Sequence, residues 1–189
     1  MQFTYKTKND IFAFLHFRFI REWQTLSVRL LVATLLLTLS NTATLAGEST
    51  ERFERGLDAF RGGDLNAAIT EWSAAAEDGN RDALFNLGLL FANGNGVKQD
   101  WDEAKTLFQK AGRRGSELAM FSLAIMYFNG QGVPKDLPMA HVWASLGADL
   151  RNETSRKLRD SIEKTMSEQE LAFSHKTKQR CIDSNYDDC

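Results

Sequence analysis

The stretch N-G-N-G-V-K-Q-D, Asn93 to Asp100, decides the fold, because it returns thirty-six residues later as N-G-Q-G-V-P-K-D, Asn129 to Asp136. An Asn-Gly pair between apolar runs is a strong β-hairpin signal. The residues before Asn93, however, do not alternate between apolar and polar as a strand would. Instead Ala83, Leu87 and Phe91 recur at every fourth position, which is one stripe of a helix. We therefore predict that each copy is a loop between two helices.

The repeated loop residues have distinct expected roles. An Asn-Gly pair supplies the left-handed conformation that ends a helix, and the second glycine of each copy lets the loop reverse. The aspartate that closes each copy is the expected N-cap of the next helix. Glu103 follows the first of these aspartates by three residues, which predicts a capping box. The repeat-defining structural residues are therefore Gly94, Gly96, Asp100, Gly130, Gly132 and Asp136.

The repeat extends well beyond the loop. Residues 81–116 and 117–152 are identical at nine aligned positions, and residues 51–80 form a degenerate unit with a shorter inter-helix loop. Periods of this length mark solenoids, in which each helix pair buries its apolar face against its neighbours. We predict an all-α fold, an α-solenoid of stacked antiparallel helix pairs over 47–152. Residues 153–189 are predicted to form capping helices and a cysteine-containing tail, with Ser167 and Glu170 as a capping box.

The pattern A-x-x-x-L-G-x-x-F-x-x-G-x-G-V-x-x-D-x-x-x-A, from Ala83 to Ala104, closely resembles the Sel-1-like repeat, a relative of the tetratricopeptide repeat. The resemblance covers roughly Glu51 to Asn152, and the tail looks like that of bacterial exported members. It implies a non-catalytic scaffold that binds proteins. Two residues depart from the pattern: Ala124 and Arg151 stand where the preceding unit has glycine.

The first 46 residues differ from the rest. An apolar run of ten residues, Leu30–Leu39, follows Arg21 and Arg29, and Thr44 and Ala46 precede a cleavage point at Gly47. These features predict a secretory signal peptide over 1–46, with an unusually long basic region before the apolar run. We therefore expect an exported, periplasmic or secreted protein. The alternatives are an uncleaved segment that anchors the chain in a membrane, or a true start codon further downstream.

The net charge and the cysteines limit the classes of partner and ligand that we expect. Without residues 1–46 the chain keeps 18 basic and 23 acidic residues, a net charge of −5, which argues against nucleic-acid binding. Membrane contact is expected only through an uncleaved N-terminal segment. In an oxidising compartment Cys181 and Cys189 are expected to form a disulfide, the alternative being two thiols in a frayed tail. Two cysteines without a nearby histidine pair do not make a zinc site.

No phosphate loop, dinucleotide fingerprint, zincin motif or nucleophile elbow is present, so we expect no catalytic residue, cofactor or metal. His141 and His175 each stand alone on a predicted helix and read as structural or surface residues. The alternative is a β-lactam or cell-wall hydrolase, as described for cysteine-rich exported relatives. Those relatives carry cysteine pairs within every repeat, and this chain does not.

The predicted partner-binding groove lies on the first helix of each unit, between the core stripes. We expect an unidentified protein or peptide as partner and a monomeric scaffold; a structural component of a membrane-anchored complex is the remaining alternative. Trp72 and Trp143 fall on core stripes, whereas Trp101 directly follows a cap and is a better candidate for a contact. The candidate groove residues are Asn86, Leu89, Ser122, Ile125 and Trp101.

Overall fold

The computed structural model describes residues 47–186 and residue 189. Contacts divide the chain into Met1–Ala46 and Gly47–Cys189, and only the second unit is described here. The predicted signal peptide therefore lies outside the described residues. Within the described part every regular element is a helix, as the sequence predicts, and no described helix combines the length and apolarity needed to span a membrane.

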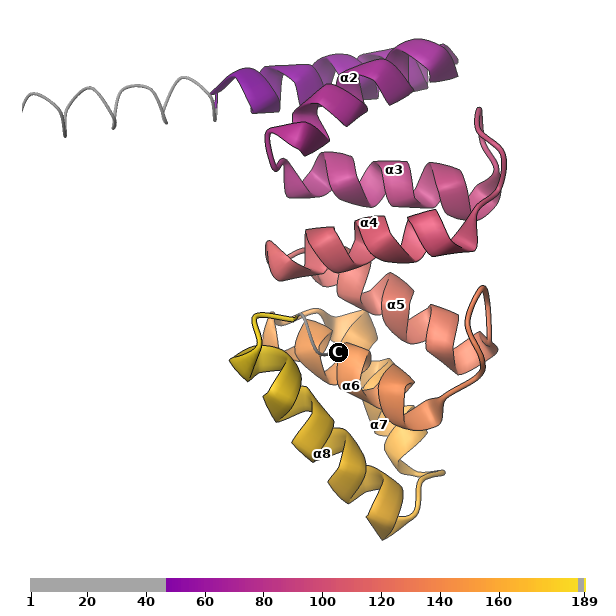
Figure 1. Ribbon diagram of the computed structural model, residues 1–189, viewed down its shortest axis with the longest axis vertical. Coiled ribbons are helices and arrows are strands. Elements are labelled where there is room, and N and C mark those ends of the chain that lie inside the picture. Colours follow the sequence, from indigo (N-terminus) through magenta and orange to yellow (C-terminus); the bar gives the residue numbers. More distant parts are fainter. Residues whose placement is uncertain (1–46, 187–188) are drawn as a thin grey trace, which may run out of the picture. The chain divides into compact units, whose positions relative to one another are not determined.

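The described residues form a stack of helix pairs (Figure 1). Each helix from α2 to α7 contacts the next along the chain, while α8 packs on α6. This neighbour-to-neighbour packing is that of a solenoid. A helix at residues 47–61 comes first. It is followed by α2 (Leu65–Glu77), α3 (Arg81–Asn93), α4 (Trp101–Arg113), α5 (Glu117–Asn129), α6 (Leu137–Asp149), α7 (Glu153–Glu163) and α8 (Glu168–Asp183).

Helix starts repeat at the period of the sequence. Each helix from α2 to α7 is preceded by a side chain that accepts a hydrogen bond from one or two of the first backbone amides of that helix, which otherwise lack partners. The N-caps of the second helices are Asp64, Asp100 and Asp136, and those of the following helices are Asn80, Ser116 and Asn152, each set spaced by 36 residues.

The capping box predicted at Asp100 is only half formed. The Asp100 carboxylate accepts from the amides of Asp102 and Glu103, both at 3.0 Å. The Asp100 amide, however, donates to the carbonyl of Phe91 at 2.9 Å, so it is already satisfied without the Glu103 side chain. That bond closes the long loop against the end of α3. In contrast, the box of Ser167 and Glu170 is complete.

Helix ends confirm the predicted turn chemistry. Gly94 and Gly130 end α3 and α5 with φ of 70° and 74°. Two residues beyond the ends of the second helices, Gly79, Gly115 and Arg151 have φ of 85°, 79° and 66°. Arg151 thus adopts the left-handed conformation of the glycines at its repeat position, and the third unit ends like the others despite the substitution.

The departure at Ala124 has a packing explanation. A Cβ added to Gly56 or Gly88 would lie 2.4 Å from the ring of Trp72 or 2.6 Å from the ring of Phe108. These glycines therefore make room for an aromatic ring on the paired helix. At the corresponding place of the third unit the ring is replaced by Ala144, so Ala124 needs no such space. Both alanines are fully buried.

The C-terminal segment covers the last helix pair, as a cap must. The α8 residues Ser174, Thr177 and Cys181 are buried, and a disulfide joins Cys181 to Cys189, as predicted. The tail carries Tyr186, whose ring stacks on that of the buried Trp143 with centroids 6.5 Å apart. Burial raises the pKa of the Tyr186 hydroxyl, and the nearby Asp149 carboxylate adds to the effect.

Candidate interaction surface

A hollow of about 210 Å³ opens between the first two units. Residues from the helix at 47–61 and from α2 form one wall, and residues from α3 form the other. The loop after α3 closes one end. The lining residues are Leu57, Phe60 and Trp72 on the first wall, Asn86, Leu89, Leu90 and Asn93 on the second, and Asn95 in the loop.

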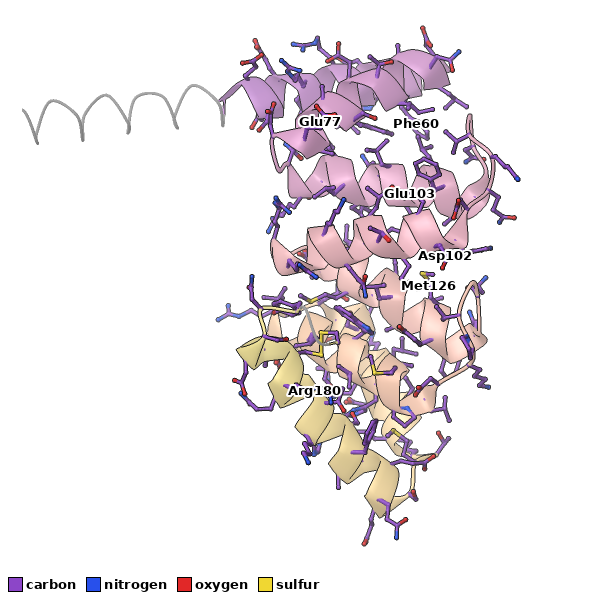
Figure 2. All side chains as sticks on the ribbon, viewed as in Figure 1. Phe60, Glu77, Asp102, Glu103, Met126 and Arg180 are labelled. Carbon is purple, nitrogen blue, oxygen red and sulfur yellow. A yellow bond between two sulfur atoms is a disulfide. The ribbon has the colours of Figure 1, made fainter. Side chains whose placement is uncertain are left out.

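Two aromatic rings of the first wall pack against each other. The rings of Phe60 and Trp72 lie 5.5 Å apart and are tilted by 35°, within the range favourable for aromatic pairs. The Trp72 indole donates to the carbonyl of Phe53 at 3.2 Å, and Gly56 leaves the space in which the indole lies. Trp72 is buried, as the sequence predicts, whereas Phe60 is 42% exposed (Figure 2). The first wall is therefore buried at Trp72 and open to solvent at Phe60.

The hollow brings together two of the predicted groove residues, Asn86 and Leu89. Their repeat equivalents Ser122 and Ile125 occupy the same positions on α5 and are also half-buried, but they do not line this hollow. The structure thus separates the predicted groove into two pairs, one per unit. Their part in binding stays a prediction.

Trp101 has a packing role. A Cβ on Gly132 would lie 2.1 Å from the Cβ of Trp101, so the loop of the third unit rests directly on this residue. The loop glycine of the second unit, Gly96, contacts Leu65 in the same way. Trp101 is half-buried beneath the loop and is available to a partner only in part.

A second, larger hollow of about 540 Å³ lies on a different side of α3, between α2 and α4. Its floor includes Leu84, Leu87 and Leu107, each at most 6% exposed. Its rim carries charges of both signs, Glu77 and Glu103 against Lys110 and Arg114. The two hollows therefore differ in character: the first has no ionisable lining residue, and the second is bordered by charged groups.

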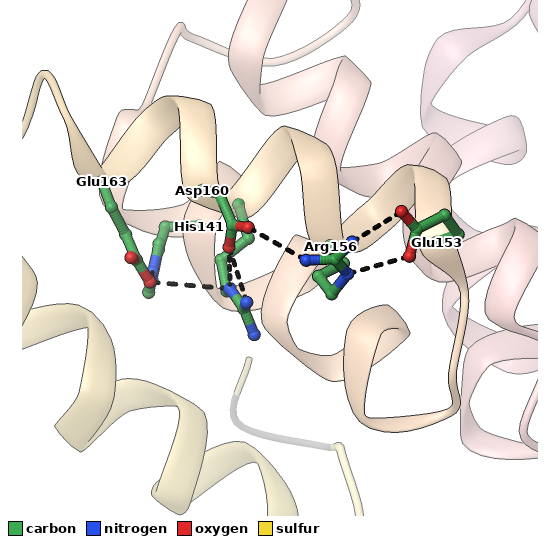
Figure 3. Close-up of polar contacts among 6 residues, drawn as sticks. His141, Glu153, Arg156, Asp160 and Glu163 are labelled. Atoms are coloured by element: carbon green, nitrogen blue, oxygen red, sulfur yellow. Dashed lines mark hydrogen bonds and ion pairs between the residues drawn. The ribbon is translucent and has the colours of Figure 1, made fainter.

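The C-terminal cap contains a polar cluster that the sequence did not reveal. His141 of α6 is 1% exposed, and its Nε2 lies 2.9 Å from Glu163 of α7 (Figure 3). Its Nδ1 lies within hydrogen-bonding distance of the Ser174 hydroxyl of α8. Because a carboxylate only accepts, Nε2 carries the proton, and Ser174 donates to Nδ1. One imidazole thus joins both cap helices to the solenoid.

Burial lowers the pKa of His141, and the hydrogen bond and charge of Glu163 oppose this effect without cancelling it. Glu163 also faces Arg159, with 3.6 Å between Oε1 and Nε. The ring of His175 lies 5.7 Å from that of His141. Further along α7, Arg156 pairs with both Glu153 and Asp160 (Figure 3). The cluster therefore continues into a row of surface ion pairs.

The hydrogen-bonded order of serine, histidine and carboxylate is that of a hydrolytic triad, but the serine and the histidine are both buried. The Ser174 hydroxyl would be the nucleophile, and Ser174 is fully buried. A nucleophile must lie beside a space that admits substrate, and neither hollow described above includes Ser174 or His141. The contacts of this cluster join α6 to α7 and α8.

The segment before α8 contains one enzyme-like motif. S-I-E-K, Ser161 to Lys164, matches the S-x-x-K pattern of penicillin-binding enzymes. Both residues are exposed near the end of α7, and neither lines the hollows. The accompanying S-D-N and K-T-G motifs do not occur in the chain. Among the described residues, no group of histidine, cysteine and acidic side chains could hold a metal ion.

Comparison with known proteins identifies the repeat. The Sel1 repeat family model matches residues 81–116 and 118–152. The chain contains Sel1 repeats. No curated protein matches its sequence significantly.

Solved structures of Sel1-type proteins have the same architecture. A protective antigen present in uropathogenic Escherichia coli strains, which displays an SLR fold, aligns with a TM-score of 0.66 and 27% identity. The alignment covers 75% of this chain but 32% of the antigen, so the chain spans about a third of that relative. A Sel1 repeat protein from Oxalobacter formigenes aligns with a TM-score of 0.57 and 28% identity, over 67% of this chain and 97% of the other.

Proposed function

We propose that this Sel1-repeat chain is an exported, non-catalytic scaffold that holds a protein partner on the first helices of its repeats. Proteins built from Sel1 repeats generally mediate protein–protein interaction. The observation that carries the proposal is the uncharged hollow beside α3, which contains Asn86 and Leu89. Ser122 and Ile125, at the equivalent positions of α5, and Trp101, at the start of α4, are proposed as further contact residues.

The distribution of chemistry favours a scaffold over an enzyme. Ser174 and His141 are buried and line neither of the two hollows, and the exposed S-x-x-K sequence lacks its companion motifs. In contrast, the repeats present matched, half-buried side chains at one period, which suits an extended partner.

Export is part of this proposal. The signal-like residues 1–46 support it, and so does the disulfide between Cys181 and Cys189, because structural disulfides persist in oxidising compartments. The periplasm is the proposed compartment. Retention by an uncleaved N-terminal anchor would keep the same domain on the outer side of the inner membrane.

Site-specific photo-crosslinking in the native host tests the scaffold function. A photoreactive amino acid at Asn93 or Asn129 would place the probe at the exposed ends of α3 and α5, the first helices of two units. The same probe at Lys110, on the exposed face of α4, is the matched control. We expect one crosslinked protein from the first-helix positions and none from Lys110.

Crosslinks from Lys110 alone would move the binding surface to the second helices and contradict the proposal. The absence of a crosslinked protein at every position, together with hydrolysis of a β-lactam or a cell-wall substrate by the purified chain, would replace the scaffold by an enzyme.

A further inference from the structure

The first hollow differs from its surroundings in charge. The described part of the chain carries many acidic and basic side chains, yet none of the eight residues that line this hollow is ionisable. Burying a charged group in such a place would remove its hydration without offering a counter-charge. The lining therefore selects against charged ligand groups.

The polar groups of the lining are all of one kind. Asn86, Asn93 and Asn95 each offer a carboxamide, which has two N–H donors and a carbonyl acceptor. Within the described part of the chain no protein group hydrogen-bonds to these three carboxamides. A peptide group presents the complementary pair, one donor and one acceptor. Asn86 is half-buried, whereas Asn93 and Asn95 are exposed, so the peptide groups of a ligand would take the place of water at these side chains.

Size and shape limit what enters. The volume of about 210 Å³ is below the range of roughly 300–1,000 Å³ typical of small-molecule sites. It exceeds the ~150 Å³ of an apolar cavity that accommodates one benzene ring. The Phe60–Trp72 pair presents aromatic surface to the space, and Leu57 and Leu89 present aliphatic surface. One aromatic or leucine-sized side chain fits these dimensions, and the open side at Phe60 leaves room for the rest of its chain.

We propose that this hollow is an anchor site for one large apolar side chain of an uncharged peptide segment, whose adjoining peptide groups hydrogen-bond to Asn86 and Asn93. The inference rests on the proposed function, since it specifies the partner chemistry of that same surface. It assigns the anchoring role to the Leu89 hollow and not to its repeat equivalent at Ile125, because Ile125 lies outside the hollow.

The test is a titration of the ¹⁵N-labelled protein followed by NMR, with the Asn side-chain amide signals as reporters. N-acetyl-phenylalaninamide is the probe, because it carries one aromatic side chain between two uncharged peptide groups. N-acetyl-alaninamide keeps the peptide groups but lacks the ring, and N-acetyl-phenylalanine keeps the ring but adds a carboxylate. We expect saturable shifts of the Asn86 and Asn93 carboxamides with the first probe, and at least tenfold weaker binding of the other two.

Variants separate this site from the rest of the surface. Leu89→Glu places a charge in the hollow and is expected to weaken the phenylalaninamide probe at least tenfold. Leu118→Glu makes the same change at a leucine of α5 that is 48% exposed and lies outside the hollow, and it should leave the titration unchanged. Asn86→Ala removes one carboxamide without touching the core and should weaken the probe at least threefold, which keeps the test valid even if Leu89→Glu unfolds.

Two results would overturn the inference: no shift of Asn86 at saturating probe, or equal binding of the phenylalaninamide and alaninamide probes. The failure of the proposed function has a different signature. If the probe binds as expected but no protein crosslinks to α3 or α5, the scaffold function fails while the anchor site stands. If a partner does crosslink but is displaced by Ile125→Glu and not by Leu89→Glu, the anchor site fails alone.

Discussion

At the scale of single residues, the helix pairs are set by glycines that face aromatic rings. Gly88 lies so close to Phe108 that a Cβ would come within 2.6 Å of the ring, and Phe108 is only 2% exposed. The ring cannot move aside without disturbing the core, since protein interiors are close-packed. We therefore predict that Gly88→Ala lowers the free energy of unfolding by about 1–3 kcal/mol, as overpacking does. Urea unfolding measures this value.

The third unit provides the control for that prediction. It carries Ala124 and Ala144 at the positions of Gly88 and Phe108, so an alanine pair is compatible with the fold. In a Phe108→Ala background the added methyl of Gly88→Ala should cost nothing, and the higher helix propensity of alanine could even give a gain of up to ~1 kcal/mol. An equal cost in both backgrounds would show that the glycine is needed for another reason than the ring.

Arg151 gives a residue-scale prediction with the opposite sign. It adopts φ of 66° at a position where the two preceding units have glycine. The left-handed conformation costs a non-glycine residue about 1–2 kcal/mol, and glycine avoids this cost. Glycine also makes the unfolded chain more flexible, which offsets up to ~1 kcal/mol of the stabilisation. Arg151→Gly should therefore raise the free energy of unfolding by up to ~1 kcal/mol, and Arg151→Ala should not. A lower urea midpoint for the glycine variant would contradict this.

At the scale of elements, His141 links α7 and α8 to the solenoid and makes the cap sensitive to acid. Because burial holds the pKa of His141 below its ordinary value, the unfolded chain binds the proton more readily than the folded one. The contribution of neutral His141 to the free energy of unfolding is therefore fully present above about pH 6.5, which is the pKa of histidine in the unfolded chain. It falls as the pH drops through that value toward the lower pKa of the folded state. A single proton limits the loss to about 1.4 kcal/mol per pH unit.

Urea unfolding between pH 7.5 and 5.5 tests this coupling. His141→Gln should be less stable at pH 7.5 but should lose less stability on acidification. His175→Gln is the matched control, because His175 is exposed and its ring lies 5.7 Å from that of His141. Glu163 and Arg159 of α7 also face the cluster and are unchanged in both variants. If the His175 variant loses the pH dependence and the His141 variant keeps it, the assignment to His141 is wrong.

The caps and the His141 cluster differ in how far they could be predicted from the sequence. Caps at Asp100 and Asp136 and helix ends at Gly94 and Gly130 were predictable, because local turn chemistry recurs at a fixed period. The His141 cluster was not, since its partners Glu163 and Ser174 lie 22 and 33 residues away in a segment without a repeat. The prediction of a complete capping box at Asp100 was wrong for a similar reason: the Asp100 amide donates to the carbonyl of Phe91, across the loop.

At the scale of the whole molecule, the disulfide closes the end of the solenoid. It joins Cys181, which is fully buried in α8, to Cys189, and it encloses Tyr186 on Trp143. Closing a loop with a sequence separation of 8 stabilises by ~2–3 kcal/mol through the unfolded chain. Cys189→Ser should therefore lower the free energy of unfolding by about that amount and expose the Trp143 ring. Urea unfolding and near-ultraviolet circular dichroism measure the two effects, and an unchanged midpoint would argue against the disulfide's role.

The location of the whole chain depends on residues 1–46, and its processing is the most direct prediction of export. Thr44 and Ala46 have the small side chains that signal peptidases require before a cleavage point. The protein isolated from its host with a C-terminal tag should therefore begin at Gly47, which intact mass spectrometry determines. Ala46→Trp places a bulky side chain at the cleavage point and should leave the N-terminal segment attached, whereas Gly47→Ala should be processed normally. An intact N-terminus in the unmodified chain, recovered with the membrane fraction, would establish the anchored alternative. The groove would then serve a partner held at the membrane surface.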